Sequence, residues 1–149
     1  MSLKIISKQK TVSVDRKTVR ALVAAILDEH DVSGADLTIT FASDPYVHEL
    51  NRDYRGIDKP TDVLSFVMQE GEGELDEGEE LVLGDIVISV DRAAVQSRRF
   101  KRTVDREMLK LVAHGVLHLL GYDHPSEKRR LEMRRIENRH VRAAVKAQS

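Results

Sequence analysis

The order of the hydrophobic patterns predicts an α+β fold, in which one mixed sheet of roughly four strands packs against about five helices. Residues 1–90 hold all the segments that have the pattern of strands, whereas residues 91–149 read as consecutive helices. The length of 149 residues and the hydrophobic content of 41% are typical of one globular domain. We therefore predict a single domain over residues 1–149.

Five segments have the composition of extended backbone: Leu3–Ser7, Val12–Val14, Asp36–Ala42, Asp62–Met68 and Leu81–Ser89. The first two are short and weakly patterned. The third, DLTITFA, alternates apolar and polar residues with the period of a strand. The last is rich in branched residues, and Gly84 and Asp85 interrupt it. A carboxylate at this point would either be paired inside the fold or face a site.

Five helices are expected, over about residues 16–30, 43–56, 91–99, 103–120 and 126–147. Asp15 is suited to cap the first of them, and Pro45 stands at the start of the second. The fourth contains no Asp, Glu, Lys or Arg between Leu111 and Tyr122. A helix that is apolar on all sides is buried, so this helix is predicted to lie at the centre of the domain.

Charge is divided along the chain. Residues 1–90 carry 9 Lys and Arg against 18 Asp and Glu, whereas residues 91–149 carry 15 against 7. Seven of the carboxylates fall in residues 70–80 among three glycines, which predicts a flexible acidic loop. The basic part favours a phosphate-bearing partner, although solvated helix faces have the same composition.

The chain has no cysteine, which excludes disulfides and thiolate metal sites. Its longest unbroken apolar run, Ala21–Leu27, is far shorter than a membrane span of about 20 residues. The start MSLKIISKQK also lacks the apolar centre of a signal peptide. A cytoplasmic location without membrane contact is therefore the expectation.

Three of the six histidines fall within residues 114–124, at spacings that a metal ion requires. His114 and His118 are four residues apart and would share one face of the predicted buried helix. Gly121 can end the helix in a left-handed conformation, so that the chain turns back and brings His124 toward the other two. Three imidazoles around an open fourth position are typical of catalytic zinc. The expected metal site thus lies on the central helix and in the turn after it.

This spacing matches the zinc-peptidase pattern H-E-x-x-H-x-x-G-x-x-H, except that Gly115 replaces the glutamate that serves as general base. A single histidine on an apolar helix face is more often a hydrogen-bonded core residue, but three together favour a metal site. Asp123 could orient a ligand or simply form the turn.

The other histidines stand alone in the sequence. His30 lies at a predicted helix end and His140 lies in an apolar stripe, so both are interpreted as structural. His48 lies one turn before Asn51 and is kept as a weaker candidate. Arg55 would ordinarily be a surface arginine, but beside the metal site its guanidinium could grip a phosphate with two hydrogen bonds.

Taken together, three segments resemble the YbeY family of bacterial rRNA maturation factors. Residues 114–124, HGVLHLLGYDH, fit the family signature H-G-x-L-H-L-x-G-Y-D-H at every fixed position. Residues 50–66, LNRDYRGIDKPTDVLSF, and residues 83–89, LGDIVIS, resemble two further family segments in the same order. Val67 departs from the family, in which many members have proline after the phenylalanine.

The resemblance implies a single-strand-directed endoribonuclease that matures the 3′ end of 16S rRNA and takes part in ribosome quality control. It implies one zinc ion on His114, His118 and His124, and it makes Arg55 the functional arginine of the cleft. It also implies contact with a small-subunit ribosomal protein and an assembly GTPase.

The leading hypothesis is zinc-assisted cleavage of a phosphodiester bond in RNA, in which the metal acidifies water or polarises a phosphoryl oxygen. Arg55 would hold the phosphate and offset its developing charge. The sequence leaves open whether water or the 2′-hydroxyl attacks. Two alternatives are kept: a small zinc metallopeptidase, for which Gly115 lacks the base, and a non-catalytic ribosome-assembly adaptor with structural zinc.

Overall fold

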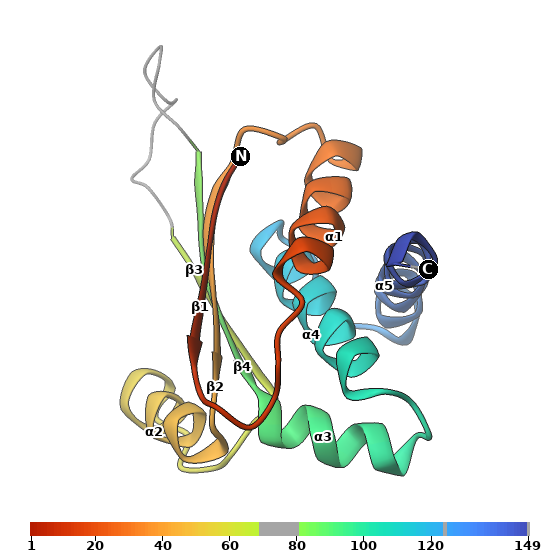
Figure 1. Ribbon diagram of the computed structural model, residues 1–149. Helices are drawn as coiled ribbons and strands as arrows, with labels where there is room; N and C mark the ends of the chain where they lie inside the picture. Colours follow the sequence, from red (N-terminus) through yellow and green to blue (C-terminus); the bar gives the residue numbers. More distant parts are fainter. Residues whose placement is uncertain (69–80, 124, 149) are drawn as a thin grey trace.

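The computed structural model describes residues 1–68, 81–123 and 125–148, which form one sheet with helices on both of its faces (Figure 1). The predicted acidic loop at 70–80 and His124 lie outside the described residues. In the described part of the chain, no helix combines the length and apolar character needed to cross a bilayer.

The sheet has four strands in the order β1–β2–β4–β3. Their bounds are β1 Ser2–Lys8, β2 Asp36–Ala42, β3 Val63–Val67 and β4 Val82–Ser89. The pairs β1–β2 and β2–β4 are parallel, whereas β3 runs antiparallel to β4 at the edge. The sheet is therefore mixed, as predicted.

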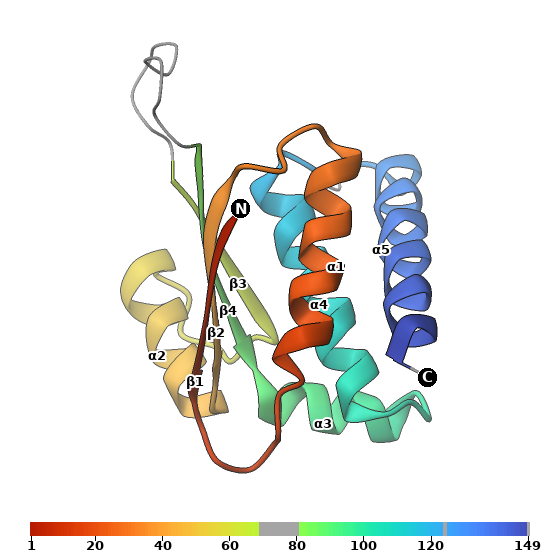
Figure 2. The ribbon, with the colours of Figure 1, turned by 45° about the horizontal axis from the view of Figure 1, so that its top comes forward.

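Five helices surround this sheet: α1 Arg16–Glu29, α2 Asp44–Arg55, α3 Val90–Arg99, α4 Val104–Leu119 and α5 Glu127–Gln148. α1, α4 and α5 lie on one face of the sheet, and α2 lies on the other (Figures 1 and 2). α3 continues directly from the end of β4 and leads into α4. The predicted α+β architecture is thus confirmed, and α4 lies between the sheet and α5.

Helix caps explain where these helices begin and end. The Asp15 side chain accepts from the backbone N–H of Thr18 at the start of α1, as its position predicted. Gly56 ends α2 in the left-handed conformation at φ 70, which glycine adopts without steric cost.

One prediction for an extended segment was wrong. Val12–Val14 is not a strand, because the Gln9 side chain bonds the N–H groups of Thr11 and Val12 and the carbonyl of Val12. This local bonding satisfies backbone groups that a strand would pair with a neighbour.

The strand predicted at Leu81–Ser89 is confirmed as β4, whose backbone runs through Gly84 and Asp85 although these two residues interrupt the apolar pattern. Gly84 has φ 140, and a Cβ atom there would lie 2.0 Å from the carbonyl oxygen of Phe66 in β3. Glycine is required here so that the two strands can pair.

The main core lies between the sheet and the three helices on its α4 side, and a smaller cluster lies beneath α2. α4 packs closely on the sheet at Gly115, where a Cβ atom would lie 2.8 Å from Cγ2 of the fully buried Ile86 in β4. The backbone of α4 therefore packs against a β4 side chain at this point.

We predict that Gly115→Ala lowers the free energy of unfolding by about 1–2 kcal/mol. Overpacking against Ile86 costs about 1–3 kcal/mol, and the better helix propensity of alanine returns at most about 1 kcal/mol. Urea unfolding would measure the difference. Gly34→Ala is the matched control, because no atom lies within 4 Å of a Cβ atom there. Equal stabilities of the two variants would contradict the close packing.

Candidate functional site

The last two turns of α4 bring His114 and His118 together on one side of the helix. Their Nε2 atoms lie 3.1 Å apart, and their ring planes meet edge to face at 77°. The His114 side chain is 29% exposed, so the pair opens toward solvent from an otherwise buried helix. The two histidines thus share one face of α4, as their spacing predicted.

Glu137 of α5 fixes the orientation of His114. The His114 Nδ1–H donates to Glu137 Oε1 at 2.6 Å, and the carboxylate side chain is only 5% exposed. With the proton held at Nδ1, the Nε2 of His114 presents a lone pair toward His118. This arrangement is the usual support for a histidine that binds a metal.

Sequence reasoning missed Glu137. The sequence does contain a pattern that could have indicated it. Glu137 falls in the buried stripe of α5, together with Met133, His140, Val141 and Ala144. A carboxylate in a buried stripe requires a partner. The sequence alone does not say which of the chain's histidines supplies it.

The two described imidazoles fit a zinc ion in their spacing. With Zn–N bonds of about 2.0–2.1 Å and tetrahedral angles, two ligand nitrogens lie about 3.3 Å apart. The observed 3.1 Å differs by only a few tenths of an ångström. Among the described residues, no group of three or more potential ligand side chains is found, and His124 is not one of the described residues.

Arg55 is the last residue of α2, and its side chain is exposed. It does not line the cavity that contains His114. The segment after it is held by Asn51, whose Nδ2 donates to the carbonyl of Lys59 at 2.8 Å. The structure therefore brings His114 and His118 together, and it places Arg55 outside the cavity that His114 lines.

The remaining sequence candidates lie elsewhere. Asp85 is exposed on β4, and Asp123 is exposed in the turn after α4. His48 makes an ion pair with Asp58 at 2.7 Å on the surface of α2. None of the three lines the cavity with His114.

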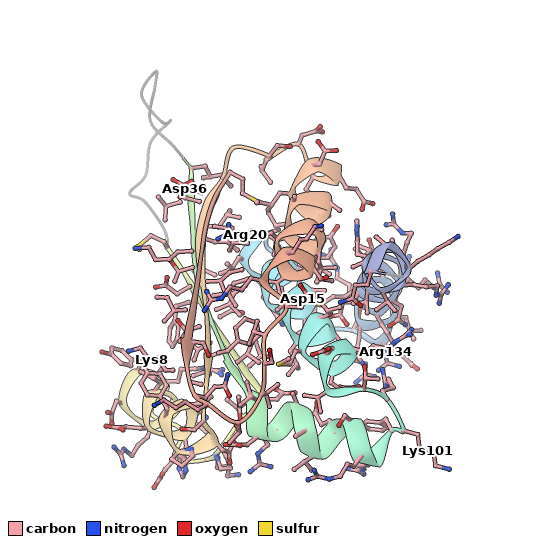
Figure 3. The ribbon with its side chains drawn as sticks, viewed as in Figure 1. Lys8, Asp15, Arg20, Asp36, Lys101 and Arg134 are labelled. Carbon is pink, nitrogen blue, oxygen red and sulfur yellow. The ribbon has the colours of Figure 1, made fainter. Side chains whose placement is uncertain are left out.

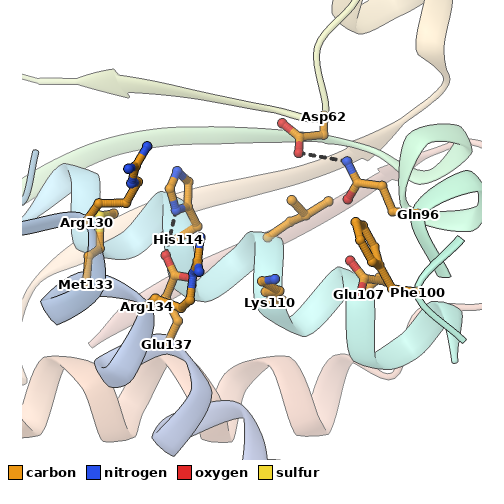
Figure 4. Close-up of a pocket in the computed structure, with 11 residues that line it drawn as sticks. Asp62, Gln96, Phe100, Glu107, Lys110, His114, Arg130, Met133, Arg134 and Glu137 are labelled. Carbon is orange, nitrogen blue, oxygen red and sulfur yellow. Dashed lines mark hydrogen bonds and ion pairs between the residues drawn. The ribbon is translucent and has the colours of Figure 1, made fainter. Parts of the chain in front are cut away.

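A cavity of about 300 Å³ adjoins His114, between α3, α4, α5 and the segment that precedes β3 (Figure 4). Six charged side chains line it: Asp62, Glu107, Lys110, Arg130, Arg134 and Glu137. Phe100 lies at the end of the cavity away from Arg130, and Glu107 lies beside it. The predicted histidine site thus opens into a polar cavity large enough for part of a ligand.

A second network ties the end of α1 to α5 and to the turn after α4. Arg139 Nη2 donates to Glu29 Oε1 at 2.7 Å, and His140 Nε2 bonds the other oxygen of Glu29. His30 bonds the carbonyl of Ile26 at 2.7 Å and the hydroxyl of Tyr122 at 2.9 Å. Both histidines therefore hold elements together, as their interpretation as structural residues proposed.

The hydrogen bond from Arg139 lowers the pKa of Glu29 to about 2, and the bond and charge of His140 act in the same direction. Burial opposes them, and it raises the pKa of the Tyr122 hydroxyl. Figure 3 shows the side chains that crowd the space between the sheet, α1 and α5.

Comparison with known proteins identifies the family. The fold resembles the solution structure of TM1509 from Thermotoga maritima, with a TM-score of 0.64 and 28% identity over 95% of this chain and 88% of that one. A family model described as Endoribonuclease YbeY matches residues 4–144. The comparisons thus define a class of α+β proteins named for nuclease activity.

Curated relatives carry the same name. The Endoribonuclease YbeY of Pelotomaculum thermopropionicum is 45% identical over 92% of this chain and 93% of its own length. That of Desulforamulus reducens is 43% identical over 92% of this chain and 93% of its own. The chain belongs to the YbeY family, a family of hydrolytic enzymes, and the resemblance of its segments is confirmed.

We predict that protonation of Glu29 in acid lowers the stability of the protein. Its pKa lies below the ordinary 4.5, so its stabilising contribution is complete above that value and is lost as the pH falls from about 4.5 to about 2. Urea unfolding across this range should show a shallower loss of unfolding free energy in Glu29→Gln. Glu49→Gln, which removes an exposed carboxylate of α2, should retain the wild-type slope. If the unfolding free energy fell equally with pH in all three proteins, Glu29 would not be the group responsible for the loss of stability.

Proposed function

We propose that this chain is a zinc-dependent endoribonuclease that cleaves single-stranded RNA in small-subunit rRNA maturation and ribosome quality control. One observation carries the proposal: the Nε2 atoms of His114 and His118 face each other at 3.1 Å. The other ring nitrogen of His114 bonds the buried carboxylate of Glu137, and His114 lines a cavity that contains six charged side chains. Membership of a family named for endoribonuclease activity supplies the substrate class.

His114, His118 and His124 are proposed to hold the zinc ion, which supplies a Lewis acid beside the phosphodiester when bound. Glu137 keeps the His114 ring in the orientation that directs Nε2 toward His118. Arg55 is proposed to bind phosphate and to offset negative charge gained in the transition state. Arg55 does not line the cavity with His114, so this role requires that the reacting phosphate lie outside that cavity and within reach of Arg55.

The metallopeptidase alternative meets a steric obstacle. A peptidase of the H-E-x-x-H type needs its carboxylate at the position of Gly115. Here that position faces the buried side chain of Ile86 rather than the cavity, since a Cβ atom would lie 2.8 Å from it. A carboxylate at residue 115 would therefore be directed into the core. Cleavage of casein by metal-loaded protein, abolished by a chelator, would nevertheless favour the peptidase.

A variant of the histidine pair distinguishes the adaptor alternative from the nuclease. If zinc serves structure alone, His114→Ala should leave RNA processing normal whenever the fold is intact.

The biological setting that we propose includes the cytoplasm, the 3′ end of 16S rRNA, a small-subunit ribosomal protein and an assembly GTPase. Analysis of the rRNA ends in cells that carry His114→Ala would test this setting.

We predict that Arg55→Glu abolishes RNA cleavage while the protein keeps its metal. Reversal of the charge repels phosphate, but the metal is retained because Arg55 is not among the residues proposed to bind it and lies outside the cavity that His114 lines. Cleavage of a defined RNA should be measured alongside zinc content. Arg52→Glu is a matched control on the same exposed part of α2. Equal activity of the two variants would remove Arg55 from the mechanism.

We predict that Glu137→Gln weakens zinc binding about 10- to 100-fold, as is usual when a histidine ligand loses its supporting carboxylate. Competition with a chromophoric chelator would measure the affinity independently of activity. Glu132→Gln makes the same change at an exposed position of α5 and should bind zinc like the wild type. Wild-type affinity in Glu137→Gln would argue that the His114–Glu137 bond serves packing alone.

A further inference from the structure

Three cationic side chains line the cavity beside His114, next to the proposed metal site. Lys110 lies one turn before His114 on α4, and Arg130 and Arg134 lie one turn apart on α5. Residues four apart share one helix face, so both helices direct these charges into the same cavity. Figure 4 shows Arg130 and Arg134 beside His114, with Lys110 farther along α4. We call Lys110, Arg130 and Arg134 the cation row.

The acidic residues of this cavity already have partners. Glu137 accepts from His114 at 2.6 Å, Glu107 pairs with Arg102 at 3.0 Å, and Asp62 accepts from Gln96 at 3.1 Å. Glu107 and Glu137 are also buried, at 2% and 4% exposure.

In contrast, no carboxylate within residues 1–68, 81–123 and 125–148 pairs with a member of the cation row. Arg130 and Arg134 are exposed, and Lys110 is half-buried. The carboxylates of the cavity already accept hydrogen bonds or pair with other side chains, so the three cations remain available to an anionic ligand, and two guanidinium groups suit the oxygens of phosphate.

Phe100 adds a surface for a base at the other end of the cavity. The residue is 52% exposed, and the guanidinium carbons of Arg99 and Arg102 lie 5.6 and 5.2 Å from the ring centre. An exposed aromatic ring among cations is the usual platform on which nucleic-acid bases stack in single strands. A double helix offers no unstacked base to such a ring.

We propose that this cavity binds single-stranded RNA next to the histidine pair, with backbone phosphates on the cation row and a base stacked on Phe100. The inference rests on the proposed function. It assigns to this cavity the segment of the RNA that lies on the α5 side of the cleavage site. It also gives α5 a role in binding RNA, which nothing in the family signature at 114–124 indicates.

Binding of a fluorescein-labelled single-stranded RNA to the full chain tests this proposal by anisotropy over a series of salt concentrations. In the double variant Arg130→Gln/Arg134→Gln, the slope of log K against log salt should fall by about 1.4, because each phosphate contact on a single strand contributes about 0.7. The double variant Arg129→Gln/Arg135→Gln is the matched control, since both arginines are exposed on α5 and neither lines the cavity.

The base contact is tested with Phe100→Ala, which should bind the same RNA roughly 5- to 100-fold more weakly, the usual effect of losing one stacked base. Phe100→Tyr retains the ring and should bind like the wild type. Double-stranded RNA of the same sequence should not distinguish Phe100→Ala from the wild type.

Equal losses in the two double-arginine variants would overturn the proposal, because they would show that only the overall charge of α5 matters. Unchanged binding in Arg130→Gln/Arg134→Gln or in Phe100→Ala would overturn it as well. Cleavage of the same RNA on a gel separates this inference from the proposed function. Wild-type protein that binds through the cavity without cutting would refute the nuclease and leave the binding site standing.

Discussion

The close packing of α4 on the sheet is the constraint on which the rest of the structure depends. α4 contacts β3, β4, α1, α3 and α5, so its depth decides where the other helices can lie. That depth is set at Gly115, which packs directly against Ile86 of β4. The same residue lies between the two histidines in sequence, so the packing that fills the core also fixes the height at which both imidazoles leave the helix. Core and site therefore share one contact.

Most of the fold could be predicted from local patterns. The alternation in Asp36–Ala42 gave a strand with the observed bounds, and the Asp15 cap marked the start of α1. Misjudged details came from contacts that local patterns do not contain. The reason for glycine at position 84 is also absent from the local sequence, because nothing nearby reveals the β3 carbonyl that requires it. The segment around Val12 looked extended because its bonding to one glutamine side chain has no hydrophobic signature.

The site was predictable where its residues lie on one helix and unpredictable where helices meet. The spacing of His114 and His118 dictates that they share a face, and their 3.1 Å approach follows from it. Glu137 is 23 positions from His114, and only the packing of α5 on α4 connects them. Arg55 belongs to α2, which covers the opposite face of the sheet from α4, so no pattern on α4 indicates it and its role stays a proposal (Figure 1).

The bonds that α5 makes have a consequence for the order in which the protein assembles during synthesis. Strand pairs and α4 can form from the part of the chain that leaves the ribosome first. His114 meets its carboxylate only after α5 has emerged, and Glu29 meets His140 across 111 positions of sequence. A nascent chain therefore has a sheet and a histidine pair before it has an oriented imidazole. The histidine site is therefore completed last, once α5 has emerged and packed against α4.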